Sequence, residues 1–155
     1  MSLKLKYFHK INKQIVIADM ISALLIVLFL YAALSKLWAY ESFKSVLIMS
    51  PLLRPFAGII ARLLPILEIG IVLLLFFPKT RVKGLYTALI ILTVFTGYIT
   101  YMIIFTPRLI CNCGGVLKSL TWTQHIFFNL FWILLTVAAI ALYQQIKKAI
   151  TTVPP

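Results

Sequence analysis

The chain has 155 residues, of which 63% are hydrophobic and 12% are charged, and its mean hydropathy is +1.05. A soluble domain of this size has no means of hiding that much apolar surface, and a disordered chain would be far more polar. The composition therefore excludes both classes. It indicates an integral membrane protein with enough apolar sequence for about four spanning helices of about 20 residues each.

The net charge of +12 comes from 15 Lys and Arg residues against three acidic residues. Such an excess is also typical of nucleic-acid-binding proteins. Here, however, the basic residues lie at the ends of apolar runs and not along one polar face. Basic clusters at these positions set the orientation of a membrane protein and meet anionic lipid headgroups. We therefore expect the lipid bilayer, and no nucleic acid, as the partner of these charges.

Four apolar runs predict an all-α membrane protein with a four-transmembrane-helix bundle over residues 18–143. A basic tail, residues 1–17, precedes the bundle, and a second tail covers residues 144–155. Asp19 is expected in the first turn of the first helix, where a carboxylate meets the positive end of the helix dipole. We place the spans at residues 18–38, 56–77, 85–106 and 122–143.

The distribution of basic residues predicts the orientation, because cytoplasmic segments carry the excess of Lys and Arg. An even number of spans puts both termini on one side, together with the turn at residues 78–84. That side carries nine basic residues, against four on the other side, or six with the nearby Lys36 and Arg62. We therefore expect a multi-pass protein of the bacterial cytoplasmic (inner) membrane with both termini cytoplasmic. The nine residues are Lys4, Lys6, Lys10, Lys13, Lys79, Arg81, Lys83, Lys147 and Lys148.

The two cysteines of the chain, Cys111 and Cys113, are separated by one residue and followed by Gly114 and Gly115. The predicted orientation puts them on the periplasmic face, where thiols become oxidised. A disulfide in so small a ring would be strained and easily reduced, which is typical of catalytic or regulatory bridges. Two alternatives stay open: two unpaired thiols in a turn, and a soft metal site formed by both thiolates and His125.

The fourth span carries a polar and aromatic stripe at helical spacing. His125 is the candidate for proton transfer during a redox step, and Asn129 and Trp122 are candidates for supporting it. The alternative is a belt of Trp and His at the level of the headgroups. The stripe consists of Trp122, His125, Asn129, Trp132 and Thr136.

Three ionisable residues are expected within or near the spans: Lys36, Arg62 and Glu68. Glu68 lies near the middle of the second span, where an ionisable group is costly and faces the bundle interior or water. Arg62 lies six residues from Glu68 and does not share its helix face, so Lys36 is the better partner. The pair is interpreted either as an ion pair that fixes helix packing or as a proton carrier or ligand contact.

Several short segments resemble a known family. Ala33-Leu34-Ser35-Lys36-Leu37 and Leu64-Pro65-Ile66-Leu67-Glu68 are similar to the first two helices of DoxX-like proteins. Cys111-Asn112-Cys113-Gly114-Gly115, followed by Trp122, His125 and Asn129, resembles the methylamine-utilisation protein MauE and its relatives. The resemblance implies a four-helix membrane protein that serves redox maturation of periplasmic proteins beside a thioredoxin-like partner. The chain is also similar to four-helix, quinone-using disulfide-generating proteins, although those have Cys-x-x-Cys pairs.

The favoured function is therefore thiol–disulfide exchange between the Cys111–Cys113 pair and a periplasmic thioredoxin-like or substrate protein. In this hypothesis Cys111 meets the partner, Cys113 resolves the mixed disulfide, and quinone is a candidate cofactor. No resident metal is assigned. The main alternative is a non-enzymatic integral subunit or assembly factor of a larger membrane complex. A small-molecule carrier centred on Glu68 is a third reading, against which the lack of internal repeats argues.

Overall fold

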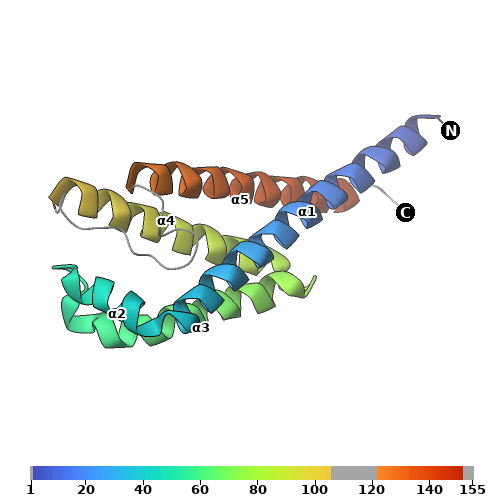
Figure 1. Cartoon of the computed structure of the whole chain (residues 1–155). Coiled ribbons are helices and arrows are strands. Elements are labelled where there is room, and N and C mark those ends of the chain that lie inside the picture. The colour runs from blue at the N-terminus through green and yellow to red at the C-terminus, as the bar shows by residue number, and fades with distance from the viewer. Residues whose placement is uncertain (1, 106–121, 152–155) are drawn as a thin grey trace.

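The computed structural model describes residues 2–105 and 122–151, and these residues form helices joined by short turns (Figure 1). Four segments are long and apolar enough to cross a membrane: Ile11–Trp38, Arg54–Phe76, Arg81–Phe105 and Thr123–Ala149. The prediction of an all-α, four-span membrane protein is thereby confirmed. The elements in chain order are α1 (Ser2–Trp38), α2 (Tyr40–Met49), the 3-10 helix η1 (Arg54–Phe56), α3 (Ala57–Phe76), α4 (Arg81–Phe105) and α5 (Trp122–Thr151).

The first helix is longer than the apolar run that it contains. α1 begins at Ser2, so residues expected as a separate tail continue the same helix. No Pro or Gly occurs between Ser2 and Trp38, so nothing in the sequence interrupts the helix. Asp19 consequently lies in the middle of α1, and its interpretation as a first-turn residue is wrong. At the other end of the chain α5 likewise continues to Thr151.

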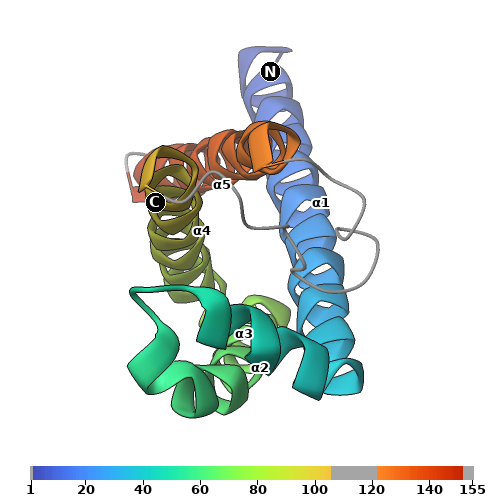
Figure 2. The same cartoon turned by 60° about the vertical axis from the view of Figure 1, so that its left-hand side comes forward.

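The segment between the first two spans is also structured. α2 buries Phe43 and Leu47, which are four residues apart and therefore on one helix face. These two side chains form a small apolar cluster with Ala57 and Ala61 of α3. α2 therefore packs across the first turns of α3, as Figure 2 shows.

The four long helices form a closed bundle in which α1 and α4 each pack against both α3 and α5 (Figure 2). α1 begins and α5 ends at the same end of the bundle, whereas α2 lies at the opposite end (Figure 1). Large apolar side chains on the outer surfaces, such as Val27, Ile66 and Leu134, are more than 60% exposed and suit contact with lipid. The central core consists of Ile21, Leu25, Phe29, Ile71, Leu75, Leu85, Ala88, Leu92, Ala139 and Ile140.

α3 and α4 approach each other closely at the turn that joins them. Thr80 donates a hydrogen bond from its hydroxyl to the carbonyl of Leu74 at 2.9 Å. Gly84, in the first turn of α4, lies against the backbone of α3. A Cβ atom at position 84 would come within 2.9 Å of the Leu75 nitrogen. The absence of a side chain at Gly84 therefore permits this contact.

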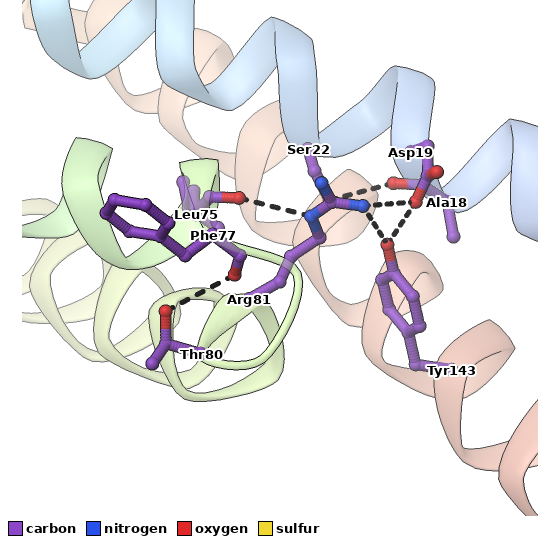
Figure 3. A network of polar contacts seen from close by, with 8 residues as sticks. All are labelled: Ala18, Asp19, Ser22, Leu75, Phe77, Thr80, Arg81 and Tyr143. Atoms are coloured by element: carbon purple, nitrogen blue, oxygen red, sulfur yellow. Dashed lines mark hydrogen bonds and ion pairs between the residues drawn. The ribbon is translucent and has the colours of Figure 1, made fainter.

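A polar cluster ties all four long helices together at the end opposite α2 (Figure 3). Arg81 Nη1 of α4 lies 2.6 Å from Asp19 Oδ1 of α1, and Arg81 Nε donates to the Leu75 carbonyl of α3 at 3.1 Å. The Tyr143 hydroxyl of α5 donates to the same Asp19 oxygen. Each polar group is therefore satisfied by a neighbouring helix, which fixes the relative register of the helices.

Candidate functional site

The half of the bundle on the side of α2 contains an ion pair that is buried between helices. Lys36 Nζ of α1 lies 2.7 Å from Glu68 Oε1 of α3, and each residue is only 6% exposed. The pairing indicated by the sequence is thus present. A lone charge at this depth would be costly, so each residue provides the counter-charge that the other needs.

The surroundings of the pair hold the ammonium group in place on three sides. Besides Glu68, Lys36 Nζ donates to the Ala32 carbonyl at 3.2 Å and lies 5.9 Å from the centre of the Phe43 ring. The carboxylate is less completely bonded, because the second oxygen, Oε2, is buried with no hydrogen-bond partner among the described residues. The pair therefore presents one unused acceptor to the bundle interior.

A second polar group of side chains lies on the inner face of α5. His125 and Asn129 are 1% and 3% exposed, so they face the interior and do not belong to a belt at the lipid surface. The His125 ring packs edge-on against Phe95 of α4, with ring centres 5.5 Å apart. Two buried donors, Asn129 Nδ2 and Trp132 Nε1, have no hydrogen-bond partner among the described residues.

The ion pair and the α5 group lie at similar distances, measured along their helices, from the Asp19–Arg81–Tyr143 cluster. Asp19 and Tyr143 meet in the polar cluster at the end opposite α2, and their contact provides a common reference point for α1 and α5. Ala32, which receives the Lys36 bond, is 13 residues further along α1, and Asn129 is 14 residues before Tyr143 on α5. At about 1.5 Å per residue, both lie about 20 Å from the cluster. The buried charge and the unused donors therefore lie at similar distances, along their own helices, from this cluster.

Arg62, the third charge expected in this region, lies apart from the ion pair. Its side chain is exposed, and Nε donates to the Tyr40 hydroxyl of α2 at 3.3 Å. Arg62 thus belongs to the outer surface of α3 and not to the interior. The sequence correctly favoured Lys36 over Arg62 as the partner of Glu68.

Three expected site residues lie wholly or partly outside the described part of the chain. Cys111 and Cys113 lie outside the described residues, and of Trp122 only the backbone, at the first position of α5, is described. The helix ends that flank the cysteine segment are nevertheless defined. α4 ends and α5 begins at the end of the bundle that carries α2 (Figure 1). Phe105 and Trp122, the helix ends on either side of the cysteine segment, therefore lie at the end nearer to the Lys36–Glu68 pair.

The sequence did not predict the Asp19–Arg81–Tyr143 tie or the Arg62–Tyr40 contact. Asp19 is separated from its partners by 62 and 124 residues, and its sequence neighbours contain no sign of either. One signal was present: Asp19 is the single acidic residue near the span ends that lie beside the two tails and the turn at residues 78–84, where several basic residues gather. An acid in that position is expected to pair with one of them.

Comparison with protein-family models gives one match, to the family described as methylamine utilisation protein MauE, over residues 14–144. The match covers all four membrane-crossing helices almost completely. The chain belongs to the MauE family. Neither the curated proteins nor the solved structures give a match. The Lys36–Glu68 pair, the α5 polar face and the cysteine segment thus all lie within the part of the chain shared with MauE-family proteins.

Proposed function

We propose that this MauE-family protein is a membrane thiol–disulfide exchange protein that uses Cys111 and Cys113. The observation that carries the proposal is the position of the two helix ends on either side of the cysteine segment. α4 ends and α5 begins at the end of the bundle whose nearer half buries an ion pair and a His–Asn face. The 15 basic residues favour an orientation in the bacterial cytoplasmic membrane with the termini inside and the cysteines on the periplasmic face.

The exchange proceeds by two thiolate attacks. The Cys111 thiolate attacks a disulfide of the partner, so that one partner thiolate leaves and a mixed disulfide forms. The Cys113 thiolate then attacks the Cys111 sulfur, which releases the second partner thiolate. Two electrons pass from the cysteine pair to the partner, and the two protons reach the partner's sulfurs through solvent. The same intermediates serve the opposite direction, in which a partner dithiol is oxidised.

The cysteine pair must be regenerated after each exchange, because these are the two cysteines of the chain. The two-electron reactant is either a second external dithiol or disulfide protein or a membrane quinone. A quinone headgroup offers carbonyl acceptors that suit the unused N–H donors of Asn129 and Trp132. His125, at the cysteine end of α5, is suited to proton transfer during the exchange. Lys36 and Glu68 hold α1 and α3 in the arrangement that encloses these groups.

The expected partner is a periplasmic thioredoxin-like protein or a substrate protein with a reactive cysteine pair. The family description refers to methylamine utilisation. We extend this setting to the present chain and propose that its client is a protein required for growth on methylamine. The second candidate function is a non-enzymatic subunit or assembly factor of a larger membrane complex in the same setting.

Serine substitutions distinguish the two functions. In a strain that depends on this chain for growth on methylamine, Cys111→Ser and Cys113→Ser should each abolish growth while the protein still accumulates in the membrane. Ser119→Ala, in the same segment, is a control that leaves both thiols in place. Normal growth with either cysteine variant would contradict the exchange function and favour the assembly factor.

A further inference from the structure

An open groove of about 590 Å³ lies on the outer surface of the bundle between α2 and α3. Its volume is within the range of about 300–1,000 Å³ found for ligand sites. Its polar lining residues are Tyr40, Lys44 and Arg62, and the rest of its lining is apolar. The groove is separate from the buried ion pair, since Arg62 lies on the exposed side of α3.

The two cations of the groove have no counter-charge within the described residues. The chain contains three acidic residues, of which Asp19 pairs with Arg81 and Glu68 pairs with Lys36. The third, Glu41, lies on α2, and no described Lys or Arg comes within 4.0 Å of its carboxylate. Neither Lys44 nor Arg62 forms an ion pair within the described residues, so both can accept a negative charge from outside the protein.

The position of Arg62 indicates where this charge lies. Arg62 is five residues into α3, about 8 Å below the start of the helix. Side chains of a helix tilt toward its N-terminus, and the N-terminus of α3 is the end covered by α2. The Arg62 guanidinium is accordingly directed toward the membrane interface, where its Nε is held by Tyr40. A cation directed toward this end of α3 can reach the phosphate of a lipid headgroup.

The apolar lining of the groove indicates the chemistry of the rest of the ligand. Ile59, Leu63 and Ile66 form a stripe down α3, and they are 64%, 49% and 62% exposed. A free phosphate ion would bind the cations but would leave this apolar stripe unused. A phospholipid satisfies both parts, with its headgroup against the cations and an acyl chain along the stripe. The lack of a nearby paired acid favours an anionic headgroup over a zwitterionic one, whose ammonium group the cations would repel.

We propose that the groove between α2 and α3 binds an anionic phospholipid, with Arg62 and Lys44 against its phosphate. The test is native mass spectrometry of the purified full-length protein with phosphatidylglycerol or phosphatidylcholine of identical acyl chains. Phosphatidylglycerol should bind at least about fivefold more tightly than phosphatidylcholine, since each basic residue at the surface favours anionic lipid by about this factor. Equal binding of the two lipids would overturn the proposal.

Three charge variants locate the site. Arg62→Gln and Lys44→Gln should each weaken phosphatidylglycerol binding about fivefold. Arg54→Gln is the matched control, because Arg54 is a cation of the same end of the bundle that does not line the groove. It should change binding by less than about twofold. An equal loss in Arg54→Gln and Arg62→Gln would show a general charge effect and contradict a defined site.

Two further measurements test the site if the Arg62 variant folds poorly, and distinguish a lipid phosphate from free phosphate. Lys44 lies on α2, outside the four spans, so Lys44→Gln still tests the site if Arg62→Gln does not accumulate. Inorganic phosphate in excess should not displace bound phosphatidylglycerol. Displacement would show that the cations recognise phosphate alone, and it would overturn the assignment of the apolar stripe to an acyl chain.

Discussion

Lys36 Nζ of α1 lies 2.7 Å from Glu68 Oε1 of α3, within the most hydrophobic part of the protein. The contact joins two helices that are separated in the chain by α2 and η1. It also uses one of the three acidic residues of the chain to neutralise a basic residue in the interior. The pair therefore explains how both charges are tolerated inside a bundle whose core is mainly apolar.

Breaking this pair on one side should destabilise the bundle. Glu68→Gln leaves the Lys36 ammonium buried without its counter-charge, and such changes typically cost about 3–5 kcal/mol. The variant should accumulate less in the membrane and unfold at a lower temperature in detergent. The double variant Lys36→Met with Glu68→Gln should recover much of the loss, because no uncompensated charge remains.

Arg62 provides the control for this experiment. Arg62 has an exposed side chain bonded to Tyr40, so adding Arg62→Gln to Glu68→Gln should not restore accumulation. If Arg62→Gln and not Lys36→Met restored accumulation of the Glu68→Gln variant, Arg62 and not Lys36 would be the partner of Glu68. Full accumulation of Glu68→Gln alone would show that Glu68 has no structural role.

Gly84 should be sensitive to the smallest added side chain. In Gly84→Ala the new Cβ would meet the Leu75 nitrogen at 2.9 Å, so α3 and α4 must move apart. Overpacking of this kind typically costs about 1–3 kcal/mol. The thermal unfolding midpoint of the purified protein should fall accordingly.

Gly97 is the matched control in the same helix. A Cβ at position 97 has nothing within 4 Å, and Ala is a better helix former than Gly. Gly97→Ala should therefore leave the unfolding midpoint unchanged or raise it. Equal destabilisation by the two substitutions would contradict a specific close approach at Gly84.

Much of the fold was predictable because each span is a long apolar run, and the cost of a lone buried charge correctly indicated Lys36 as the partner of Glu68. The ends of the helices were less predictable, since hydropathy marks the part of α1 that crosses the membrane and not its helical extension to Ser2. The tie between Asp19 and Arg81 depends on the packing of α1 against α4 and α5. Local sequence patterns contain no record of such a tertiary contact.

His125 should contribute to thiol exchange and not to folding. His125→Phe keeps an aromatic ring against Phe95 but removes the imidazole that we propose transfers protons. General acid–base catalysis typically contributes about 10²–10⁴-fold, so the exchange rate should fall by at least about tenfold while the unfolding midpoint stays close to wild type. The rate is measured with a thioredoxin-like protein and the purified variant.

Thr136→Val serves as the control for His125. Thr136 is buried on the same face of α5 but lies 11 residues closer to the inner end, away from the cysteine segment. Its substitution should leave the exchange rate unchanged. A slower exchange in both variants would indicate a packing effect along the whole face of α5. An unchanged exchange rate in His125→Phe would show that His125 takes no part in the mechanism.

The orientation can be tested by labelling thiols from one side of the membrane. In spheroplasts, a membrane-impermeant maleimide should react with reduced Cys111 or Cys113, because these cysteines are expected on the periplasmic face. A cysteine-free variant with Ser2→Cys should react only after the membrane is broken. The opposite labelling pattern would reverse the orientation and remove the oxidising environment on which the redox function depends.

The central claim is that the cysteine pair exchanges disulfides with an external protein. Trapping of the mixed disulfide tests this most directly. Cys113→Ser removes the resolving thiol, so Cys111 should remain covalently bound to its partner.

The measurement is a non-reducing gel of membranes from cells that express Cys113→Ser, Cys111→Ser or the double variant, followed by identification of the bound protein. We expect a reductant-sensitive adduct with a thioredoxin-like or substrate protein in Cys113→Ser, and none in Cys111→Ser or the double variant. An adduct in Cys111→Ser alone would exchange the roles of the two cysteines. The absence of an adduct in both single variants would contradict thiol–disulfide exchange by this protein.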